Sequence, residues 1–250
     1  MNKLKKTAAN MLLNYVMDNP MEKLPKMFEL AEKLDRGNMH EVQIRTMREV
    51  LLDENNIWHK FTKDLFQDVH PKLIQKFLEC FIINANLEGY ERSRAVEEKY
   101  NCNVPWVILM DPTSACNLHC TGCWAAQYGN KNNLSYETLD SICRQGKELS
   151  IYFYIFSGGE PLMRKKDIIR LCREHQDCYF FAFSNGTLVD DELCRDMLEV
   201  GNFALAFSIE GDEEATDMRR GKGTYRKVIE AMERMRKHKL LFGYSTCYHR

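Results

Sequence analysis

The feature that most constrains the fold is an alternation of short apolar runs with longer helical stretches in the second part of the chain. Five runs have the length of strands: Trp106–Met110, Tyr152–Phe156, Tyr179–Ser184, Phe203–Ile209 and Phe242–Tyr248. Four stretches between them have helical periodicity: Ser135–Leu149, Lys165–His175, Asp190–Val200 and Tyr225–His238. This alternation predicts parallel strands joined by crossover helices, and unbroken apolar runs predict strands that are buried on both faces.

Polar, glycine-rich segments follow the carboxyl end of each expected strand. A β/α barrel places its active-site loops at these ends. The expected fold is therefore α/β, a partial (β/α) barrel with its functional site at the carboxyl edge of the sheet.

The first hundred residues have a different pattern, which is helical throughout. After Pro20, which suits the first turn of a helix, further helical patterns run over His40–Leu52, Trp58–Val69 and Lys72–Leu87. The last of these is expected to begin at Pro71 and to end at Gly89. The chain is thus expected to have two parts, an all-α region over residues 1–100 and the barrel over residues 101–250.

Charge and hydropathy exclude several classes of protein. The 250 residues carry 35 basic and 36 acidic side chains, a formal charge of -1, so nothing indicates a nucleic-acid partner. The most apolar stretch, Phe77 to Leu87, contains Glu79, Asn84 and Asn86 and falls short of the roughly 20 residues of a membrane-spanning helix. The N-terminus also lacks the uninterrupted apolar core of a signal peptide. The expected location is the cytoplasm.

Ten cysteines in a cytoplasmic chain are expected to be reduced thiols. Most of the scattered ones are expected to pack in the core, because free cysteine behaves as a small hydrophobe. These are Cys80, Cys102, Cys143, Cys172, Cys178, Cys194 and Cys247.

The other three cysteines stand close together, directly after the first expected strand, as Cys116-Asn117-Leu118-His119-Cys120-Thr121-Gly122-Cys123-Trp124. Three thiolates on one loop can hold three irons of a cubane cluster and leave the fourth iron open to a ligand. A zinc site is the alternative, although His119 adjoins Cys120 and could hardly reach the same tetrahedral centre. Cys102 is then a conceivable fourth ligand.

The spacing Cys-x3-Cys-x2-Cys followed by an aromatic residue resembles the signature of the radical S-adenosylmethionine (radical SAM) enzymes. The resemblance implies that Cys116, Cys120 and Cys123 bind a [4Fe-4S] cluster whose fourth iron is chelated by S-adenosylmethionine. Trp124 matches the aromatic residue near the adenine.

Further segments match the family in order. Gly158, Gly159 and Glu160 resemble the Gly-Gly-Glu element that binds the cofactor's amino group; glycines permit close backbone approach and a carboxylate suits an ammonium ion. Asn185, after the third expected strand, stands in a segment that also resembles the family and is expected to bind the cofactor. Ser208 and Glu210 resemble the ribose-contacting element. Arg219-Arg220-Gly221 resembles the segment whose arginine binds the cofactor's carboxylate; Arg220 aligns best, and Arg219 remains an alternative.

The resemblance extends over about residues 105–248 and is to a poorly characterised group with an N-terminal helical segment. Family barrels have six β/α units, of which five are expected here, so the chain is expected to be truncated at its C-terminus. The implied activity is reductive cleavage of S-adenosylmethionine to a 5′-deoxyadenosyl radical, which abstracts hydrogen from a small-molecule, lipid or peptide substrate, with lipid or peptide modification favoured. Reduced ferredoxin or flavodoxin is the expected electron donor, in an anaerobic setting.

Two other functions remain open at this stage, an iron-sulfur protein that only carries electrons and a zinc-stabilised interaction module. No substrate-side catalytic residue can be assigned. Tyr128, Tyr154, Cys247 and Tyr248 stand near expected strand ends, yet each is better explained by packing or by a solvated surface.

Overall fold

The computed structural model describes residues 11, 13, 15–35, 40–129 and 131–246. The chain forms two compact units, Met1–Gln75 and Lys76–Arg250. The boundary expected at residue 100 coincides with the end of the last helix before the sheet, whereas the compact units divide twenty-five residues earlier. Cys247 and Tyr248, at the end of the fifth expected strand, lie outside the described residues.

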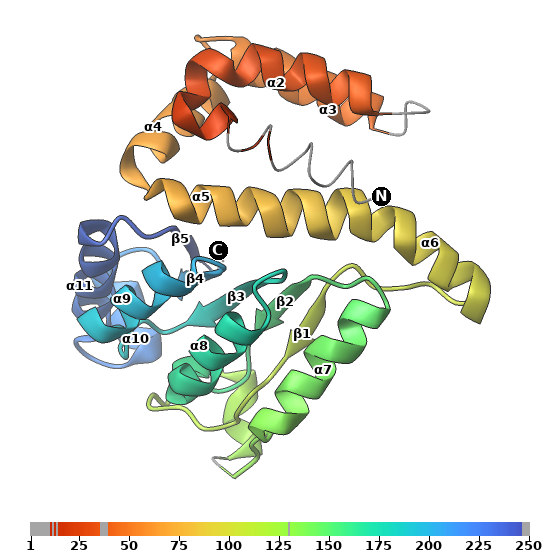
Figure 1. Ribbon diagram of the computed structural model, residues 1–250. Coiled ribbons are helices and arrows are strands. Elements are labelled where there is room, and N and C mark those ends of the chain that lie inside the picture. The colour runs from red at the N-terminus through yellow and green to blue at the C-terminus, as the bar shows by residue number, and fades with distance from the viewer. Residues whose placement is uncertain (1–10, 12, 14, 36–39, 130, 247–250) are drawn as a thin grey trace. The chain divides into compact units, whose positions relative to one another are not determined.

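The N-terminal unit is helical, as predicted, and its helices are drawn in red to orange in Figure 1. It contains α2 (Pro20–Leu34), α3 (Glu41–Leu52), α4 (Ile57–Asp68) and most of α5 (Pro71–Phe77). Leu24 and Phe28 of α2 are buried, and Arg48 of α3 forms an ion pair with Glu32 of α2. Among the described residues, α3 and α4 contribute no fully buried side chain.

A five-stranded parallel sheet forms the second unit, in the order β1-β2-β3-β4-β5. This confirms the predicted partial β/α barrel. The strands are β1 (Ile108–Met110), β2 (Phe153–Phe156), β3 (Tyr179–Ser184), β4 (Phe203–Ser208) and β5 (Phe242–Ser245). The helices are α7 (Tyr136–Glu148), α8 (Lys165–Glu174), α9 (Asp191–Val200), α10 (Glu213–Arg220) and α11 (Thr224–Lys237).

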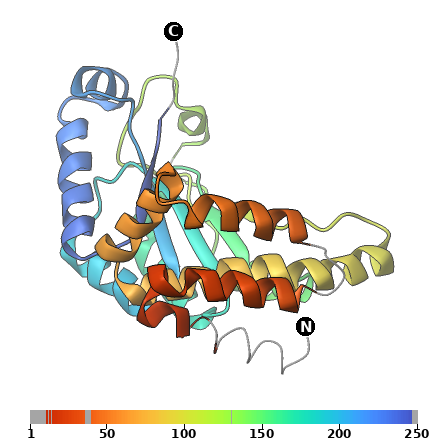
Figure 2. The ribbon, with the colours of Figure 1, turned by 90° about the horizontal axis from the view of Figure 1, so that it is seen from above.

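The sequence of strands is also their order in space, because each crossover helix returns the chain to the neighbouring position (Figure 1). Figure 2 shows the same strands from above, with α11 at the β5 end of the sheet. All five carboxyl ends consequently meet at one edge. Helix α10 was not predicted and lies directly beyond β4.

The face of the sheet that contacts the helices is the main core. Tyr154 and Phe156 of β2, Phe180 of β3 and Phe207 of β4 are fully buried there. The hydroxyl group of Tyr154 lies 3.0 Å from the carbonyl oxygens of Cys143 and Ile151, which share its single proton. Gly146 of α7 makes room for this hydroxyl, since a Cβ at that position would lie 2.2 Å from it. Tyr154 is thus a packing residue.

Changing Tyr154 to Phe is expected to lower the free energy of unfolding by about 1–3 kcal/mol, because two buried carbonyl oxygens lose their donor. Urea unfolding measures this. The matched control is Tyr244→Phe, at a residue that is 73% exposed, where no change is expected. Equal losses in the two variants would contradict the role given to the Tyr154 hydroxyl group.

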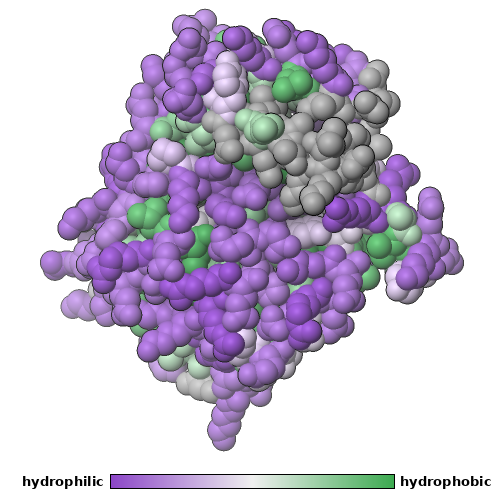
Figure 3. Space-filling model, viewed as in Figure 1, coloured by the Kyte–Doolittle hydropathy of each residue, from purple (hydrophilic) through white to green (hydrophobic). Residues whose placement is uncertain are grey.

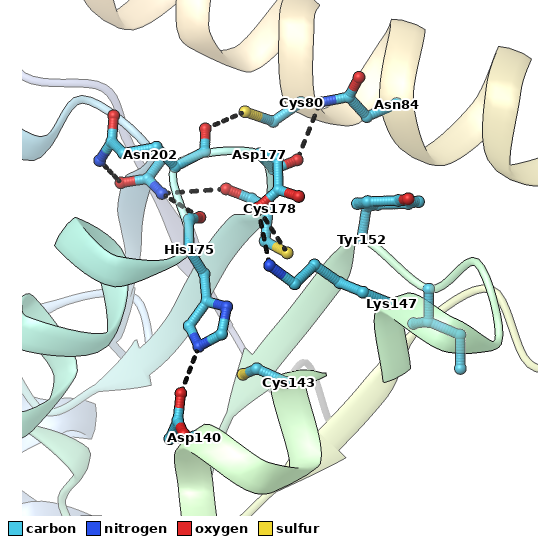
Figure 4. Close-up of polar contacts among 12 residues, drawn as sticks. Cys80, Asn84, Asp140, Cys143, Lys147, Tyr152, His175, Asp177, Cys178 and Asn202 are labelled. Atoms are coloured by element: carbon cyan, nitrogen blue, oxygen red, sulfur yellow. Dashed lines mark hydrogen bonds and ion pairs between the residues drawn. The ribbon is translucent and has the colours of Figure 1, made fainter. Parts of the chain in front are cut away.

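The opposite face of the sheet is covered at its amino end by a π-helical segment, η1 (Leu78–Glu88). Phe81 of η1 packs edge to face on Phe153, with ring centroids 5.1 Å apart. Cys80 is fully buried against Tyr179 and Ala204. Figure 4 shows Cys80 and Asn84 above the loop before β3, where Cys80 Sγ donates to Gln176 O and Asn84 Nδ2 to Asp177 O.

The helix does not end at Gly89, contrary to the prediction. It continues as α6 (Gly89–Tyr100) and ends at Asn101, which adopts a left-handed conformation. Gly89 has ordinary helical angles, and a Cβ there would lie 3.0 Å from the carbonyl oxygen of Ser150. The glycine therefore permits close packing of the helix on this loop and does not terminate it.

No helix of the described residues is long and apolar enough to cross a membrane. The surface in Figure 3 is mainly hydrophilic, with hydrophobic residues in small, separate groups.

Candidate functional site

The cysteine loop begins directly after β1 and is held by segments that follow two other strands. Gly159 N donates to Thr113 O at 3.0 Å, and Glu160 N donates to Ala115 O at 2.8 Å. Asn185 Nδ2 donates to Asn117 Oδ1 at 2.9 Å. The loop is therefore fastened to the ends of β2 and β3 by its first residues.

The far end of the loop reaches helix α10. Thr121 N donates to Arg219 O at 2.8 Å. Together with the contacts at Thr113, Ala115 and Asn117, this bond brings the cysteines over the carboxyl ends of β2, β3 and β4. Elements far apart in sequence thus meet at the site, as the strand order predicts.

The three predicted cysteine ligands are partly exposed and share one neighbourhood. Burial raises the pKa of Cys116, and the neighbouring Cys120 and Cys123 raise it further. Burial also raises the pKa of Cys120, while the positive charges of Arg220 and Arg219 oppose that shift. Iron bound among the three sulfurs would relieve the repulsion between their thiolates, and the all-sulfur donor set fits an iron-sulfur cluster.

Within the described part of the chain, no three His, Cys, Asp or Glu side chains already converge at metal-ligand distances. His119 and Cys102 are exposed. The loop brings the thiols together, and the final geometry would form with the metal.

Glycines of the expected amino-binding element lie against the cysteine loop. Gly158 has φ +104°, which favours glycine, and a Cβ there would meet Thr113 O at 2.7 Å. A Cβ on Gly159 would lie 2.2 Å from Ala115 O. These glycines therefore allow two backbone segments to approach each other, in addition to any contact with a cofactor.

Glu160 is buried, and its carboxylate is hydrogen-bonded to the protein. It is 1% exposed. Oε1 accepts from Leu162 N at 3.0 Å and from Ser184 Oγ at 2.8 Å, and Oε2 accepts from Asn185 N at 2.7 Å. Burial raises the pKa of this carboxyl, and the hydrogen bonds from Asn185 and Leu162 oppose the shift. Through these hydrogen bonds, Glu160 links the segment after β2 to the segment after β3.

Asn185 lies beside the first cysteine. Its Nδ2 is 3.9 Å from Cys116 Sγ, within range of a weak hydrogen bond to sulfur, and its Oδ1 accepts from Thr187 N at 3.0 Å. The side chain is thereby held at the cluster loop.

The structure brings Glu210 and both candidate arginines together. Arg220 donates from Nε and Nη2 to Glu210 Oε1 at 2.9 and 2.7 Å, and Arg219 Nη1 donates to the same oxygen at 2.7 Å. The Glu210 side chain is 8% exposed and that of Arg220 14%. Arg220 is also near Cys120 and Glu160, whose pKa values it lowers. Ser208, in register with Ser245, ends β4 nearby.

Trp124 begins a 3₁₀ turn, η2 (Trp124–Tyr128), and packs edge to face on Tyr128 with ring centroids 6.0 Å apart. Both side chains line a pocket of about 450 Å³, with Gly158 and Gly159 on another wall. Trp124 and the two glycines therefore line one pocket.

Asp111 was not singled out from the sequence. It follows β1 directly and lines the same pocket. The sequence signal that could have identified Asp111 is its position directly after a strand, which Asn185 and Glu210 share.

Comparison with known proteins supports these observations. The model of the radical SAM superfamily matches residues 110–247, more than half of the chain. A Fe-coproporphyrin III synthase of Methanosarcina barkeri is 30% identical over 142 residues, which are 55% of this chain and 35% of that protein. An AdoMet-dependent heme synthase of the same organism is 29% identical over 154 residues, 58% of this chain and 43% of that protein. The chain thus spans well under half the length of these relatives.

Among solved structures, Streptococcus suis SuiB bound to its precursor peptide SuiA has the same fold. It superposes with a TM-score of 0.55 at 18% identity, over 66% of this chain and 38% of that one. The sheet order, the cysteine loop and the match to the family model agree, and the chain belongs to the radical SAM superfamily.

Proposed function

We propose that this chain is the catalytic part of a radical SAM enzyme, which cleaves S-adenosylmethionine reductively and uses the product to activate an organic substrate. The observation that carries the proposal is the meeting of the three-cysteine loop with the Gly-Gly-Glu, Asn185 and Glu210–Arg220 segments at the ends of four strands. Members of this family use a [4Fe-4S] cluster and S-adenosylmethionine. When bound, these groups supply a 5′-deoxyadenosyl radical that abstracts hydrogen.

Each part of the site has a proposed task. Cys116, Cys120 and Cys123 would hold the cluster. Arg220, already oriented by Glu210, would hold the cofactor's carboxylate, since a guanidinium suits bidentate recognition.

The remaining contacts to the cofactor are proposed as follows. Ser208 and Glu210 would contact the ribose, Trp124 the adenine, and the backbone of Gly158 and Gly159 the amino end. Asn185 would orient the loop beside Cys116.

The test is anaerobic reconstitution of the full-length protein with iron and sulfide, followed by dithionite and S-adenosylmethionine. The expected result is cluster absorbance and 5′-deoxyadenosine that forms only when iron, sulfide and reductant are all present. A cluster without 5′-deoxyadenosine would favour an electron carrier. Bound zinc without a cluster would favour an interaction module.

Lipids and peptides are the proposed substrate classes, with reduced ferredoxin or flavodoxin as the electron donor. Two relatives are named as synthases of heme and Fe-coproporphyrin III, so tetrapyrroles join the candidates. A true substrate should lose a hydrogen atom that then appears in 5′-deoxyadenosine. Isotope-labelled candidates, followed by mass spectrometry, identify it.

A further inference from the structure

The pocket beside Trp124 contains a carboxylate that no proposed contact uses. Its walls come from the ends of β1 and β2, from η2 and from the segment before α7, and its charged lining residues are Asp111 and Lys131. Its volume of about 450 Å³ is in the range of small-ligand sites. The question is which ligand group faces the carboxylate.

The Glu160 carboxylate is buried and already accepts three hydrogen bonds from the protein, which leaves it little capacity for a ligand. Both of its oxygens accept hydrogen bonds from the protein, and the side chain is 1% exposed. A positively charged ligand group in this part of the pocket therefore needs a carboxylate other than Glu160.

Asp111 meets that requirement. Its side chain packs over Gly158, where a Cβ would lie 2.9 Å from the Cβ of Asp111. Among the described residues, no hydrogen bond or ion pair involves its carboxylate. The residue is exposed overall, and partial desolvation of its carboxyl raises the pKa of Asp111.

The pocket walls favour a cation with an apolar part. Trp124 and Tyr128 are 57% and 59% exposed and present aromatic surface to the pocket. Aromatic faces and a carboxylate together attract an ammonium group. Lys131 lines the same pocket, and its positive charge would attract an acidic group on the same ligand.

We propose that Asp111 receives the primary ammonium group of a ligand in this pocket. The inference deepens the proposed function and rests on it. Two sources share this chemistry, the α-ammonium group of S-adenosylmethionine and an amine of the substrate. In either case Glu160 is a positioning residue, and Asp111 is the acid that contacts the ligand.

The first arm of the test measures the cofactor. Equilibrium dialysis with the reconstituted, unreduced protein gives the Kd for S-adenosylmethionine and for an analogue without the α-amino group. If the cofactor is the source, Asp111→Asn weakens binding of S-adenosylmethionine by about tenfold to a hundredfold, the range of a charge-assisted hydrogen bond, and leaves binding of the analogue unchanged.

The second arm measures a substrate amine. Phenethylamine is titrated into the protein in the presence of enough S-adenosylmethionine to fill its site. The same titration with 2-phenylethanol gives the uncharged comparison. Saturation-transfer NMR measures the binding of both compounds. If the substrate is the source, wild type binds the amine better than the alcohol, and Asp111→Asn removes the difference. The amine titration is repeated without cluster.

The control is Glu214→Gln, which removes one negative charge at an exposed residue beyond the pocket. Thermal unfolding of Asp111→Asn should match wild type, because the carboxylate has no partner to lose. Unchanged affinities for both S-adenosylmethionine and phenethylamine in Asp111→Asn would overturn the inference. Failure of the proposed function would show separately, as wild-type protein without a cluster or without 5′-deoxyadenosine.

Discussion

Changing Cys116, Cys120 or Cys123 to Ala, one at a time, is expected to abolish cluster assembly and all formation of 5′-deoxyadenosine. Each thiol lies on the loop fastened over β2, β3 and β4, and each is partly exposed. Three thiolates hold three of the four irons, so loss of one removes an iron ligand. Iron and sulfide content, visible absorbance and 5′-deoxyadenosine are the measurements.

The matched controls are Cys143→Ala and Cys194→Ala, which remove the same number of thiols from the core. Both side chains are fully buried. Burial raises the pKa of Cys143 to about 12 and that of Cys194 to about 11, so neither provides a thiolate at neutral pH. These variants should keep their iron and lose about 1 kcal/mol of stability through the small cavities they leave.

An equal loss of iron in the core variants would contradict the assignment, as would a full complement of iron in any loop variant. Stability measured on the protein without cluster separates a missing ligand from a disrupted fold. The loop variants should unfold like wild type in that state.

The strands could be predicted closely because their apolar runs are bounded by polar residues and glycines. The expected burial on both faces holds for β4, whereas β1, β3 and β5 carry exposed side chains such as Leu109 and Phe183. The expected run Tyr179–Ser184 is β3 without change, and Tyr152–Phe156 exceeds β2 by one residue. Such runs contain few polar residues, so their bounds are set where polar residues and glycines begin.

Helix α10 was missed because only Thr216 of it is buried, so it has no apolar stripe. The available signals were at its start, where Asp212 accepts from Ala215 N at 2.8 Å and two acidic residues follow. The helix matters for the site, because its last turn carries Arg219 and Arg220.

The site residues could be placed by motif, but their hydrogen-bond partners could not. The sequence shows a carboxylate at Glu160 and another at Asp111. It cannot show that Ser184 and Asn185 occupy the first, because these contacts depend on the register between β2 and β3. The structure therefore adds two facts to the motif: Glu160 links the segments after β2 and β3, and Asp111 lines the pocket.

The second glycine of the motif is expected to be intolerant of change, because it packs against the backbone that follows β1. Gly159→Ala should lower the free energy of unfolding by about 3 kcal/mol and reduce cluster content sharply. A Cβ at Gly159 would lie 2.2 Å from Ala115 O and 2.5 Å from Ser114 O, both backbone atoms. Overpacking against backbone is relieved only by moving the segment that leads into Cys116.

Displacing that segment also breaks the bonds from Gly159 N to Thr113 O and from Glu160 N to Ala115 O, which fix the start of the cysteine loop. Urea unfolding and iron content should therefore fall together. The matched control is Gly243→Ala in β5, where a Cβ would meet no atom within 4 Å. Alanine there should be neutral or slightly stabilising, since it restricts the unfolded chain.

If Gly159→Ala kept wild-type stability and iron content, the close approach of the two backbone segments would not be what holds the loop. A loss of iron at unchanged stability would instead assign Gly159 to contact with the cofactor alone. The expected combined loss follows from one cause, because the segment that the glycine packs against is the one that carries the first cysteine.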